Sequence, residues 1–419
     1  MHKFAHLSDC HLGAWKHPAL QKVEIEAFYR ILDTCLKEKV NFIVISGDFF
    51  HSNLPDLGVV RMVVRKLKQV HDAGVPIYVV YGSHDYSPND NSMIDILTDA
   101  GLLTKIKKGY EKDGKIKLDF ILDQQTGAKI TGLSGRKMGI ERHYYEDLDR
   151  ELLEKESGFK IFVFHAGLDE LKPKALADMD SMPISLLPRG FDYYAGGHVH
   201  KQMMEEFSGY GKVCYPGPSF AGYSRDLEDS ARGQKRGFFI VEFDEKVRDV
   251  KFREIDSVQY LYFEHDATDK NANIVQEELK LKIGTLDAKG KIVVMKIKGD
   301  LSGGKTSDIN FSELRQLLNS KGAIHVQTNR YDLRSKEYLA SISGDIGQDP
   351  KQIEERILRE NIDSVKVSFP ALKGKEGSGL AIELLAILRQ DQKANERKSD
   401  YVGRVLDSCK ESLHLEEIE

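Results

Sequence analysis

Five short segments of the chain carry aspartate and histidine at spacings that suit the binding of divalent metal ions. They are SDCH with Asp9 and His11, SGDFFH with Asp48, YGSHD with Ser83, His84 and Asp85, FVFHAG with His165, and AGGHVH with His198 and His200. In the first and last segments one residue separates the two polar residues, so in an extended chain both side chains point to the same side. Imidazole and carboxylate ligands together favour manganese, iron or zinc over calcium.

Each segment has an ordinary structural explanation when it is taken alone. Asp-x-His is common, Gly-Asp after a strand is usually a turn, and GHVH by itself gives about even odds of a site. The ordered series, with every member at a predicted strand end, favours one shared metal site instead. Seven other histidines have no such setting and are interpreted as structural or solvated: His2, His17, His71, His143, His265, His325 and His414.

The elements that must position these residues form an α/β pattern in the first part of the chain. Nearly continuous apolar runs predict buried strands at 4–8, 41–46, 77–81, 161–165 and 192–197. Between the first three runs, apolar residues recur at helical spacing over 20–35 and 60–70. Because reactive residues in such sheets gather beyond the carboxyl ends of the strands, the site is predicted to assemble from loops that are distant in sequence.

The alternation of apolar strands with amphipathic helices ends near residue 257. Two apolar strands around a short helix predict a small α+β domain over 257–343, after a first domain over 1–256. Residues 344–419 are predicted to be helical, with a capping box at Asp349 and Gln352. Two apolar stripes follow in this segment, one formed by Leu380, Leu384, Ile387 and Leu388 and the other by Val402, Val405, Leu406 and Cys409.

Composition narrows the classes of protein. The chain has 419 residues, 41% hydrophobic content and no run long enough to span a bilayer, so we expect a soluble, cytoplasmic protein of two or three domains without a membrane partner. Its four cysteines lie far apart, which argues against disulfides and structural zinc. With a net charge of -5, any DNA contact must come from local basic residues, for which the candidates are Lys296, Lys298, Arg330 and Arg334.

The series of motifs resembles the calcineurin-like metallophosphoesterase superfamily. More narrowly, FAHLSDCHLG, ISGDFFH, GGHVH and YPGPSF, with the layout of the C-terminal half, are similar to the nuclease subunit of double-strand-break repair, the meiotic-recombination-eleven (bacterial SbcD) family. The resemblance implies an α/β fold: a layered metallophosphoesterase β-sandwich flanked by helices, followed by a small α+β cap domain that binds DNA and by C-terminal helices.

The resemblance also implies roles for individual residues. Two manganese ions, or alternatively magnesium, iron or zinc, would be bridged by Asp48. Asp9, His11 and His200 would complete one site, and Ser83, His165 and His198 would complete the other. His84 would stabilise the transition state or protonate the leaving 3′ oxygen. Asp85 would orient His84, and His51 would help to place the phosphate or the DNA end.

Ser83 departs from the pattern, since the family loop reads Gly-Asn-His-Asp and this chain reads Gly-Ser-His-Asp. A serine hydroxyl is shorter than an asparagine amide and is a weaker neutral ligand, so we expect the second ion to be held less tightly. The charged ligands and the imidazoles are all retained, which favours an active site over a decayed one.

The function that the resemblance implies is a manganese-dependent DNA nuclease, acting as a 3′–5′ exonuclease on double-strand ends and as an endonuclease on single strands. Its C-terminal helices would bind a coiled-coil ABC-type ATPase of the Rad-fifty (SbcC) kind, and the protein would form a homodimer. Two alternatives stay open. One is a phosphodiesterase or phosphatase acting on small phosphate esters, and the other is a catalytically weak DNA-end scaffold.

Overall fold

The structure is a computed structural model of the chain. It describes residues 1–87, 91–106, 109–135, 141–172, 180–335, 354–356, 358–359, 362, 370–393, 398–413 and 415. These residues fall into two compact units, one made of Met1–Gly299 with Ser307–Leu333 and the other of Asp300–Thr306 with Arg334–Glu419. The predicted division at residues 256 and 343 stays a prediction.

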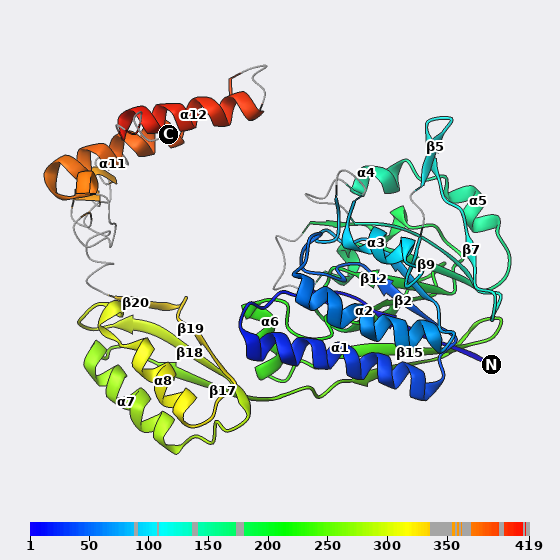
Figure 1. The fold of residues 1–419 in the computed structure, drawn as a ribbon, viewed down its shortest axis with the longest axis horizontal. Helices are drawn as coiled ribbons and strands as arrows, with labels where there is room; N and C mark the ends of the chain where they lie inside the picture. Colours follow the sequence, from blue (N-terminus) through cyan, green and yellow to red (C-terminus); the bar gives the residue numbers. More distant parts are fainter. Residues whose placement is uncertain are drawn as a thin grey trace. The chain divides into compact units, whose positions relative to one another are not determined.

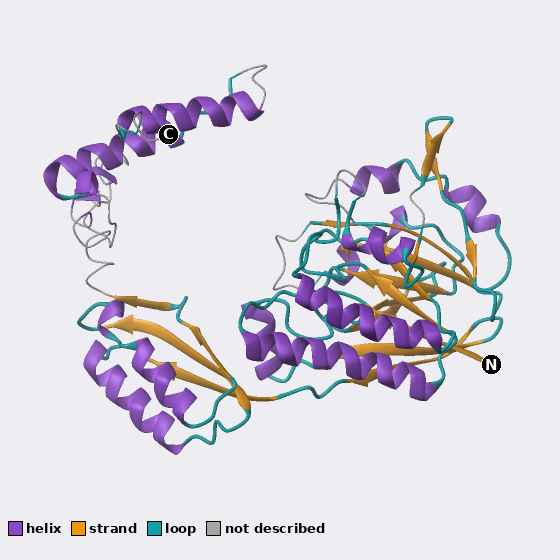
Figure 2. Cartoon of the chain, in the orientation of Figure 1, coloured by secondary structure: helices purple, strands orange, loops and turns teal. Residues whose placement is uncertain are grey.

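Two six-stranded sheets form the framework of the first unit (Figures 1 and 2). The first sheet has the order β16 (Val247–Glu254), β15 (Gly237–Phe243), β1 (His2–Leu7), β2 (Phe42–Ser46), β3 (Ile77–Val80), β4 (Thr104–Lys105). The second has the order β13 (Met203–Glu206), β14 (Lys212–Tyr215), β12 (Tyr193–Gly197), β9 (Lys160–His165), β8 (Lys129–Leu133), β7 (Ile121–Leu122). Strands β1 to β4 are mutually parallel, as are β8, β9, β12 and β14.

The two sheets pack face to face through a shared apolar core. Phe4 and Phe42 of the first sheet stack with ring centroids 5.1 Å apart, and Tyr193 of the second sheet meets Phe4 edge to face at 5.1 Å. Ile161 and Val163 of β9 belong to the same buried cluster. Strands that are buried on both faces need apolar residues at every position, which is why the predicted strands read as continuous apolar runs. The predicted β-sandwich is confirmed.

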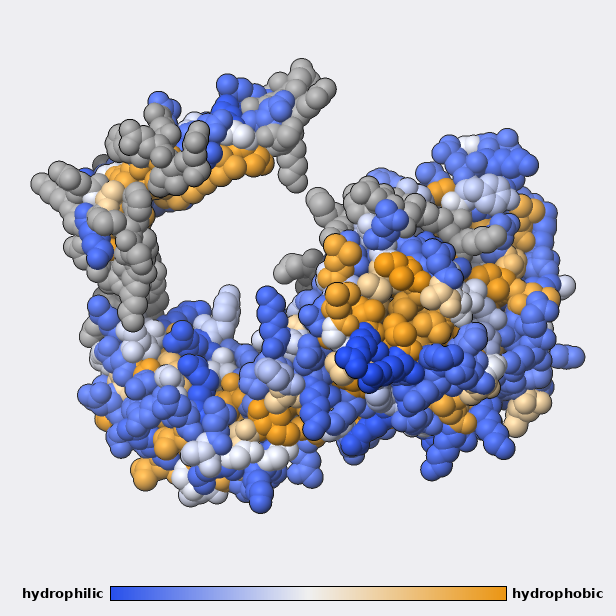
Figure 3. Space-filling view, viewed as in Figure 1, coloured by the Kyte–Doolittle hydropathy of each residue, from blue (hydrophilic) through white to orange (hydrophobic). Residues whose placement is uncertain are grey.

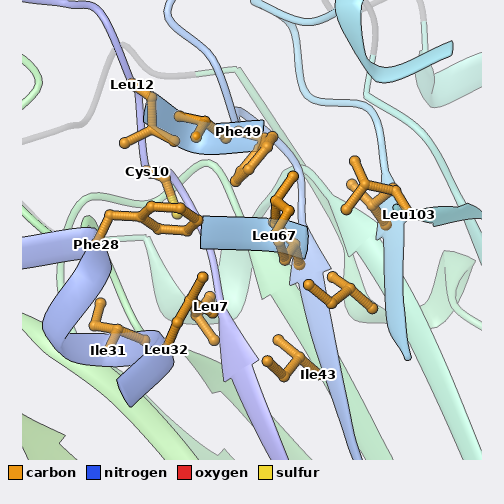
Figure 4. Packing of buried hydrophobic residues seen from close by; sticks show 14 of the residues in the cluster. Leu7, Cys10, Leu12, Phe28, Ile31, Leu32, Ile43, Phe49, Leu67 and Leu103 are labelled. Atoms are coloured by element: carbon orange, nitrogen blue, oxygen red, sulfur yellow. The ribbon is translucent and has the colours of Figure 1, made fainter. Parts of the chain in front are cut away.

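Helices cover the outer face of the first sheet. They are α1 (Pro18–Glu38), α2 (Leu57–Asp72) and α3 (Met93–Asp99). Phe28, Ile31 and Leu32 of α1 lie over Leu7 and Ile43 of the sheet (Figure 4). Each fully buried side chain of this size stabilises the fold by about 1.5–3 kcal/mol relative to exposure. The two helices predicted between the first three strands are therefore confirmed.

A small domain follows the two sheets in the sequence. Its sheet consists of β17 (Gln259–Asp266), β18 (Lys291–Leu301), β19 (His325–Asn329) and β20 (Leu333–Ser335), with helices α7 (Ala272–Thr285) and α8 (Phe311–Ser320). Strands β18 and β19 and helix α8 match the predicted elements. Helix α7 was not predicted, because its apolar residues include the exposed Ile274 and Leu281 and its stripe is therefore indistinct.

Short elements complete the first unit: β5 (Tyr110–Lys112), β6 (Lys115–Lys117), α4 (Glu141–Glu146), α5 (Arg150–Lys155), β10 (Gly167–Leu168), β11 (Ser181–Met182) and α6 (Ser224–Ala231). In the second unit, α11 (Gly374–Leu388) and α12 (Lys398–Ser412) confirm the last two predicted helices. The capping box predicted at Asp349 lies outside the described residues. Among the helices that the structure describes, none combines the length and the apolar character needed to cross a membrane.

Candidate metal centre

The ten predicted site residues lie at the ends of five neighbouring strands or on the loops that follow them. Strands β1, β2 and β3 lead into the loops of Asp9, Asp48 and Ser83. In the second sheet β9 ends at His165, and Gly197 of β12 pairs directly with it, which brings the following histidine loop alongside. Because the carboxyl ends of parallel strands meet at one edge, residues that are nearly 200 positions apart in sequence become neighbours.

The backbone is strained at several predicted ligands. Asp9, His11, Asp48 and His198 adopt positive φ angles of 49°, 45°, 50° and 90°. Such conformations cost a non-glycine residue about 1–3 kcal/mol each and tend to cluster at functional sites. The Asp9 amide donates to the Gly47 carbonyl at 3.1 Å and the His11 amide to the Asp48 carbonyl at 2.9 Å, so the first two loops hold each other in place.

Two glycines allow the loops to approach closely. A Cβ atom on Gly82 would lie 2.0 Å from Asp48 Oδ1, and a Cβ on Gly197 would lie 1.9 Å from the Ser46 carbonyl oxygen. Both distances are far below van der Waals contact, and the atoms in the way belong to the site or to the backbone of β2. Any larger residue at either position would therefore displace the site itself.

Asp48 lies at the middle of the site. Its Oδ1 accepts a hydrogen bond from the His84 amide at 2.8 Å, while Oδ2 lies 3.3 Å from His165 Nε2 and 3.7 Å from His11 Nε2. Burial raises the pKa of Asp48, but the neighbouring imidazoles, His165 first, outweigh it and hold the pKa below its ordinary range. One oxygen of an anionic carboxylate thus lies between two imidazoles, where it could bridge two cations.

His165 has an unused ring nitrogen. Its Nδ1 donates to the Ser46 carbonyl at 2.8 Å, which directs Nε2 at Asp48, and Nε2 makes no hydrogen bond to any described residue. Burial lowers the pKa of His165, but Asp48 outweighs that effect and raises it to about 10. Without a metal, a proton on His165 Nε2 would supply the positive charge that the Asp48 carboxylate attracts. A divalent cation could replace that proton.

Asp9, His11 and His200 form a second part of the site. His11 Nε2 and His200 Nε2 are 3.0 Å apart, and Asp9 Oδ1 lies 3.9 Å from the latter. Burial holds the pKa of His11 well below its ordinary value although the Asp48 carboxylate opposes the shift, and this favours the neutral ring that a metal ligand requires. Two ring nitrogens at this distance need a proton or a cation between them, and this donor set fits a cation.

Asp226 supports His200 and was not predicted from the sequence. Its carboxylate accepts from His200 Nδ1 at 3.0 Å and from the amides of Gly222 and Tyr223 at 3.0 Å each. A carboxylate behind a histidine fixes the tautomer that leaves Nε2 free for a metal. The signal in the sequence was the position of Asp226 at the third residue of α6, a place typical of a capping box.

Three groups of side chains have ligand atoms close enough to share one metal ion: Asp9 with His11 and His200, Asp9 with Asp48 and His165, and His11 with His51 and His84. The first group agrees with the predicted ligands of one site. The second group contains Asp48 and His165, which were predicted for the other site, but its third member is Asp9 and not Ser83 or His198. The His198 ring lies beside His165 at 5.3 Å between centroids, and Ser83 is half-buried in the turn next to His84. The ligand roles of Ser83 and His198 stay predictions.

The contacts of His84 differ from the predicted arrangement. Its Nδ1 donates to the His51 carbonyl at 2.8 Å, and the two rings stack with centroids 4.9 Å apart. Asp85 instead accepts from the backbone amides of Phe49, Phe50 and Gly82, each at 3.0 Å. The hydrogen bonds of Asp85 thus join the loops after β2 and β3, and the main chain of His51 orients His84.

Tyr223 is a second residue that sequence reasoning missed. Its hydroxyl lies 2.8 Å from His84 Nε2, and its ring centroid is 5.4 Å from that of His11 and 5.5 Å from that of His200. The residue is 39% exposed, so it lies at the mouth of the site. Nothing in its local sequence distinguishes it from the other sixteen tyrosines, since its partner His84 is 139 positions away.

The chain is similar in sequence to known phosphoesterases and DNA repair proteins. Residues 2–202 match the model of the calcineurin-like phosphoesterase family. Proteins named DNA double-strand break repair protein Mre11 are 24% identical over 350 residues in Archaeoglobus fulgidus, 26% over 257 in Methanocaldococcus jannaschii and 31% over 209 in Sulfurisphaera tokodaii. These alignments cover 75%, 57% and 49% of this chain and 73%, 62% and 50% of those proteins. A dimetal phosphatase from Danio rerio aligns over 60% of this chain and 96% of its own with a TM-score of 0.36 and 11% identity, too low to add to the sequence matches.

Proposed function

Residues 2–202 match the calcineurin-like phosphoesterase family, and on this premise we propose that the protein is a manganese-dependent nuclease of DNA double-strand-break repair. It would act as a 3′–5′ exonuclease on double-strand ends and as an endonuclease on single strands. One observation carries the proposal: Asp48 Oδ2 lies between the Nε2 atoms of His165 and His11, in a buried site whose donors fit divalent cations. The names of the similar repair proteins support DNA as the substrate.

The proposed ligands divide between two sites that share Asp48. Asp9, His11 and His200 would complete one, and His165, His198 and Ser83 the other. When bound, such ions polarise a phosphate and lower the pKa of a coordinated water towards neutrality. Manganese is proposed from the resemblance to the repair nucleases, with magnesium, iron and zinc as alternatives, and the mixed imidazole and carboxylate set suits borderline divalent ions better than calcium.

The protein's own groups would supply positioning and proton transfer. His84 Nδ1 is fixed as a donor by the His51 carbonyl, so Nε2 is the atom that can face a leaving oxygen. The His51 ring, stacked on His84, lies where it could contact a phosphate. Asp85 would act through the loops that it ties together, which carry Asp48 and His84.

A comparison of two substrates tests the proposal. A blunt DNA duplex and bis(p-nitrophenyl) phosphate are incubated with the protein after removal of metal and after addition of manganese. The nuclease proposal requires metal-dependent cleavage of the duplex. Turnover of the small diester alone would favour a phosphodiesterase of small esters, and no turnover of either would favour a DNA-end scaffold.

Ser83→Asn is expected to lower the manganese concentration for half-maximal cleavage, because the longer amide oxygen reaches the second ion better than the hydroxyl does. The turn around Ser83 lies against Asp48, since the His84 amide donates to that carboxylate. The measurement is a manganese titration of both proteins on one duplex. An unchanged midpoint would mean that Ser83 only shapes the turn.

Asp226→Asn is expected to weaken manganese binding about 10–100-fold, since residues behind a ligating histidine contribute this much to metal affinity. The asparagine keeps the size of the side chain but weakens the interaction with His200 Nδ1. Calorimetric titration with manganese measures the change. Asp229→Asn, one turn further along α6, is the matched control, and equal effects of the two changes would contradict the role of Asp226.

The cap is proposed to contact the DNA backbone, and the structure narrows the candidate residues. Lys296 pairs with Asp332 at 3.1 Å and Lys298 pairs with Glu264, so their charges are partly neutralised. Arg330 lies over the Phe311 ring, and both Arg330 and Arg334 are exposed. Because phosphate contacts set the salt dependence of binding, charge reversal of the two arginines would flatten that dependence, whereas an unchanged slope would place the DNA contact elsewhere.

The C-terminal helices are proposed to bind the coiled coil of a Rad-fifty (SbcC) type ATPase. Val405 of α12 is buried, whereas Leu388, Val402 and Leu406 stay 60%, 43% and 54% exposed, and Figure 3 shows apolar surface along these helices. Such a stripe fits helix-in-groove recognition. Leu388→Glu combined with Leu406→Glu would abolish co-purification with the ATPase and leave cleavage of the duplex intact. Retained co-purification would contradict the proposal that these helices bind the ATPase.

A homodimer is proposed from a second apolar surface. Leu54, Leu57 and Ile96 are 73%, 77% and 57% exposed, and the Met93 amide donates to the Asn53 carbonyl, which brings α3 beside the loop before α2. Figure 3 shows apolar atoms gathered on this face of the first unit. Light scattering would give a molecular mass of about twice 47.4 kDa, and a monomeric mass would exclude the dimer. A cytoplasmic location beside the DNA would follow from the proposed function.

A further inference from the structure

Arg236 is a buried arginine whose guanidinium contacts the main chain beside the proposed metal centre. The residue is 6% exposed and lies directly before β15. Its Nη1 donates to the His200 carbonyl at 3.1 Å, and its Nη2 donates to the Asp226 carbonyl at 2.9 Å. A buried guanidinium is costly unless acceptors surround it. Here one acceptor belongs to a proposed metal ligand and another to the residue that holds the ring of that ligand.

Two further residues complete the arrangement. The Nε of Arg236 donates to Ser230 Oγ at 2.8 Å, and that hydroxyl donates to the Asp226 carbonyl at 2.7 Å. The side-chain amide of Gln234 donates to the His200 carbonyl at 2.6 Å. The main chain of His200 is thus held by two donors, while its ring is held at Nδ1 by the Asp226 carboxylate at 3.0 Å.

The planar shape of the guanidinium gives this contact a geometric consequence. Because its nitrogens are fixed in one plane, donation to both carbonyls sets the distance between the main chains of His200 and Asp226. That distance in turn limits where the His200 ring can lie. A shift of this main chain would move Nε2 relative to Asp9 Oδ1 and His11 Nε2, which now lie 3.9 Å and 3.0 Å from it.

We propose that Arg236 is a positioning residue that holds His200 in place for the metal ion it would share with Asp9 and His11. The inference rests on the proposed metal-dependent function, and Arg236 does not itself touch the ion. An arginine that only stabilised the fold would affect both proposed ions alike. A positioning arginine acts on the site that contains His200 and leaves the site that contains His165 nearly unchanged.

Arg236→Lys keeps the positive charge, which lies 3.9 Å from Asp226 Oδ1, but removes the fork that binds two carbonyls. Calorimetric titration is expected to show one of two manganese-binding events weakened about 10–100-fold and the other nearly unchanged. Asp226→Asn should weaken the same event, and the double variant should lose less than the product of the two losses, because both act through His200. Arg253→Lys, in an arginine that pairs with Glu38 at 2.7 Å, is the matched control and should change neither event.

Two outcomes of this titration would overturn the proposal: equal weakening of both events, and a lower midpoint of thermal unfolding with unchanged manganese affinities. Gln234→Ala covers the case in which Arg236→Lys does not fold, because Gln234 is half-buried and is one of the two side-chain donors to the His200 carbonyl. It is expected to weaken the same event about 3–10-fold, since one hydrogen bond is lost. Unchanged manganese binding in this variant would also contradict the proposal.

A measurement on the metal-free protein tests the contact itself. The sequence contains two His–Lys pairs, His2–Lys3 and His200–Lys201. A protein labelled with ¹³C at histidine carbonyls and ¹⁵N at lysine amides therefore gives two signals in a spectrum that correlates these nuclei, and His2→Gln removes the first. Since a carbonyl carbon moves upfield when it loses a hydrogen bond, Arg236→Lys should move the His200 signal and leave the His2 signal in place.

The two readouts keep this inference separate from the nuclease function, because neither depends on cleavage. A His200 signal that does not respond to Arg236→Lys would overturn the proposed contact even if the wild-type protein cleaves DNA. A wild-type protein that binds manganese but does not cleave the duplex would count against the nuclease function alone. A wild-type protein that binds no manganese would overturn both.

Discussion

Asp48→Ala is expected to abolish manganese binding and to lower cleavage of duplex DNA by at least about 10³-fold. The carboxylate is 2% exposed, and its Oδ2 lies 3.3 Å from His165 Nε2 and 3.7 Å from His11 Nε2, which belong to the two proposed metal sites. A bound metal contributes several kcal/mol of transition-state stabilisation, and each 1.36 kcal/mol corresponds to a factor of ten in rate. Calorimetric titration with manganese and a nuclease assay on the same samples measure both effects.

The control for this change is Asp72→Ala, at the exposed end of α2, which should bind manganese and cleave DNA as the unchanged protein does. Retention of two bound manganese ions by Asp48→Ala would contradict the bridging role. The carboxylate would then be a structural acceptor for the His84 amide, and the remaining groups around Asp9 would be the metal site.

His84→Ser is expected to behave differently, lowering turnover on duplex DNA by about 10²-fold or more while manganese binding stays nearly normal. General acid catalysis contributes about 10²–10⁴-fold, and the His51 carbonyl holds His84 Nδ1 as a donor, which leaves Nε2 as the nitrogen that could supply the proton. Single-turnover cleavage at saturating manganese measures the chemical step. His143→Ser, at a 77% exposed side chain, is the matched control.

The structure also defines the competing outcome for this variant. His84 belongs with His11 and His51 to a group whose ring nitrogens could share a metal ion. If His84→Ser loses one equivalent of bound manganese, His84 is a ligand and its proposed role in proton transfer is wrong. A loss of turnover with both ions retained separates the two roles.

The sequence predicted the framework well because its signals are local. Strands buried on both faces read as apolar runs, and α1 and α2 carry clear apolar stripes, so each could be predicted from a short window. Each predicted ligand stands directly after such a strand. Helix α7 was missed because exposed apolar residues blur its stripe. The antiparallel strands β15 and β16 were also missed; β15 pairs with β1, from the other end of the domain, and β16 pairs with β15.

The residues that were missed in the site are those whose partners are distant in sequence. Asp226 acts on His200 across 26 positions, and Tyr223 acts on His84 across 139. Asp85 shows the converse case. Because Asp85 follows His84 in the sequence, a contact between the two side chains was predicted. The loop folds so that the Asp85 carboxylate accepts hydrogen bonds from three backbone amides instead. Motifs thus predict which residues belong to the site, whereas the hydrogen bonds between them depend on the conformation of the folded loops.

The most direct test of the account is a manganese titration of the chelator-treated protein, with bound metal and cleavage of a blunt duplex measured on the same samples. The account predicts no cleavage without metal, binding of two ions per chain with the second weaker because of Ser83, and cleavage that rises with occupancy of the second site to give 3′ hydroxyl and 5′ phosphate ends. Full occupancy of both sites without cleavage, or cleavage that persists in chelator, would contradict it.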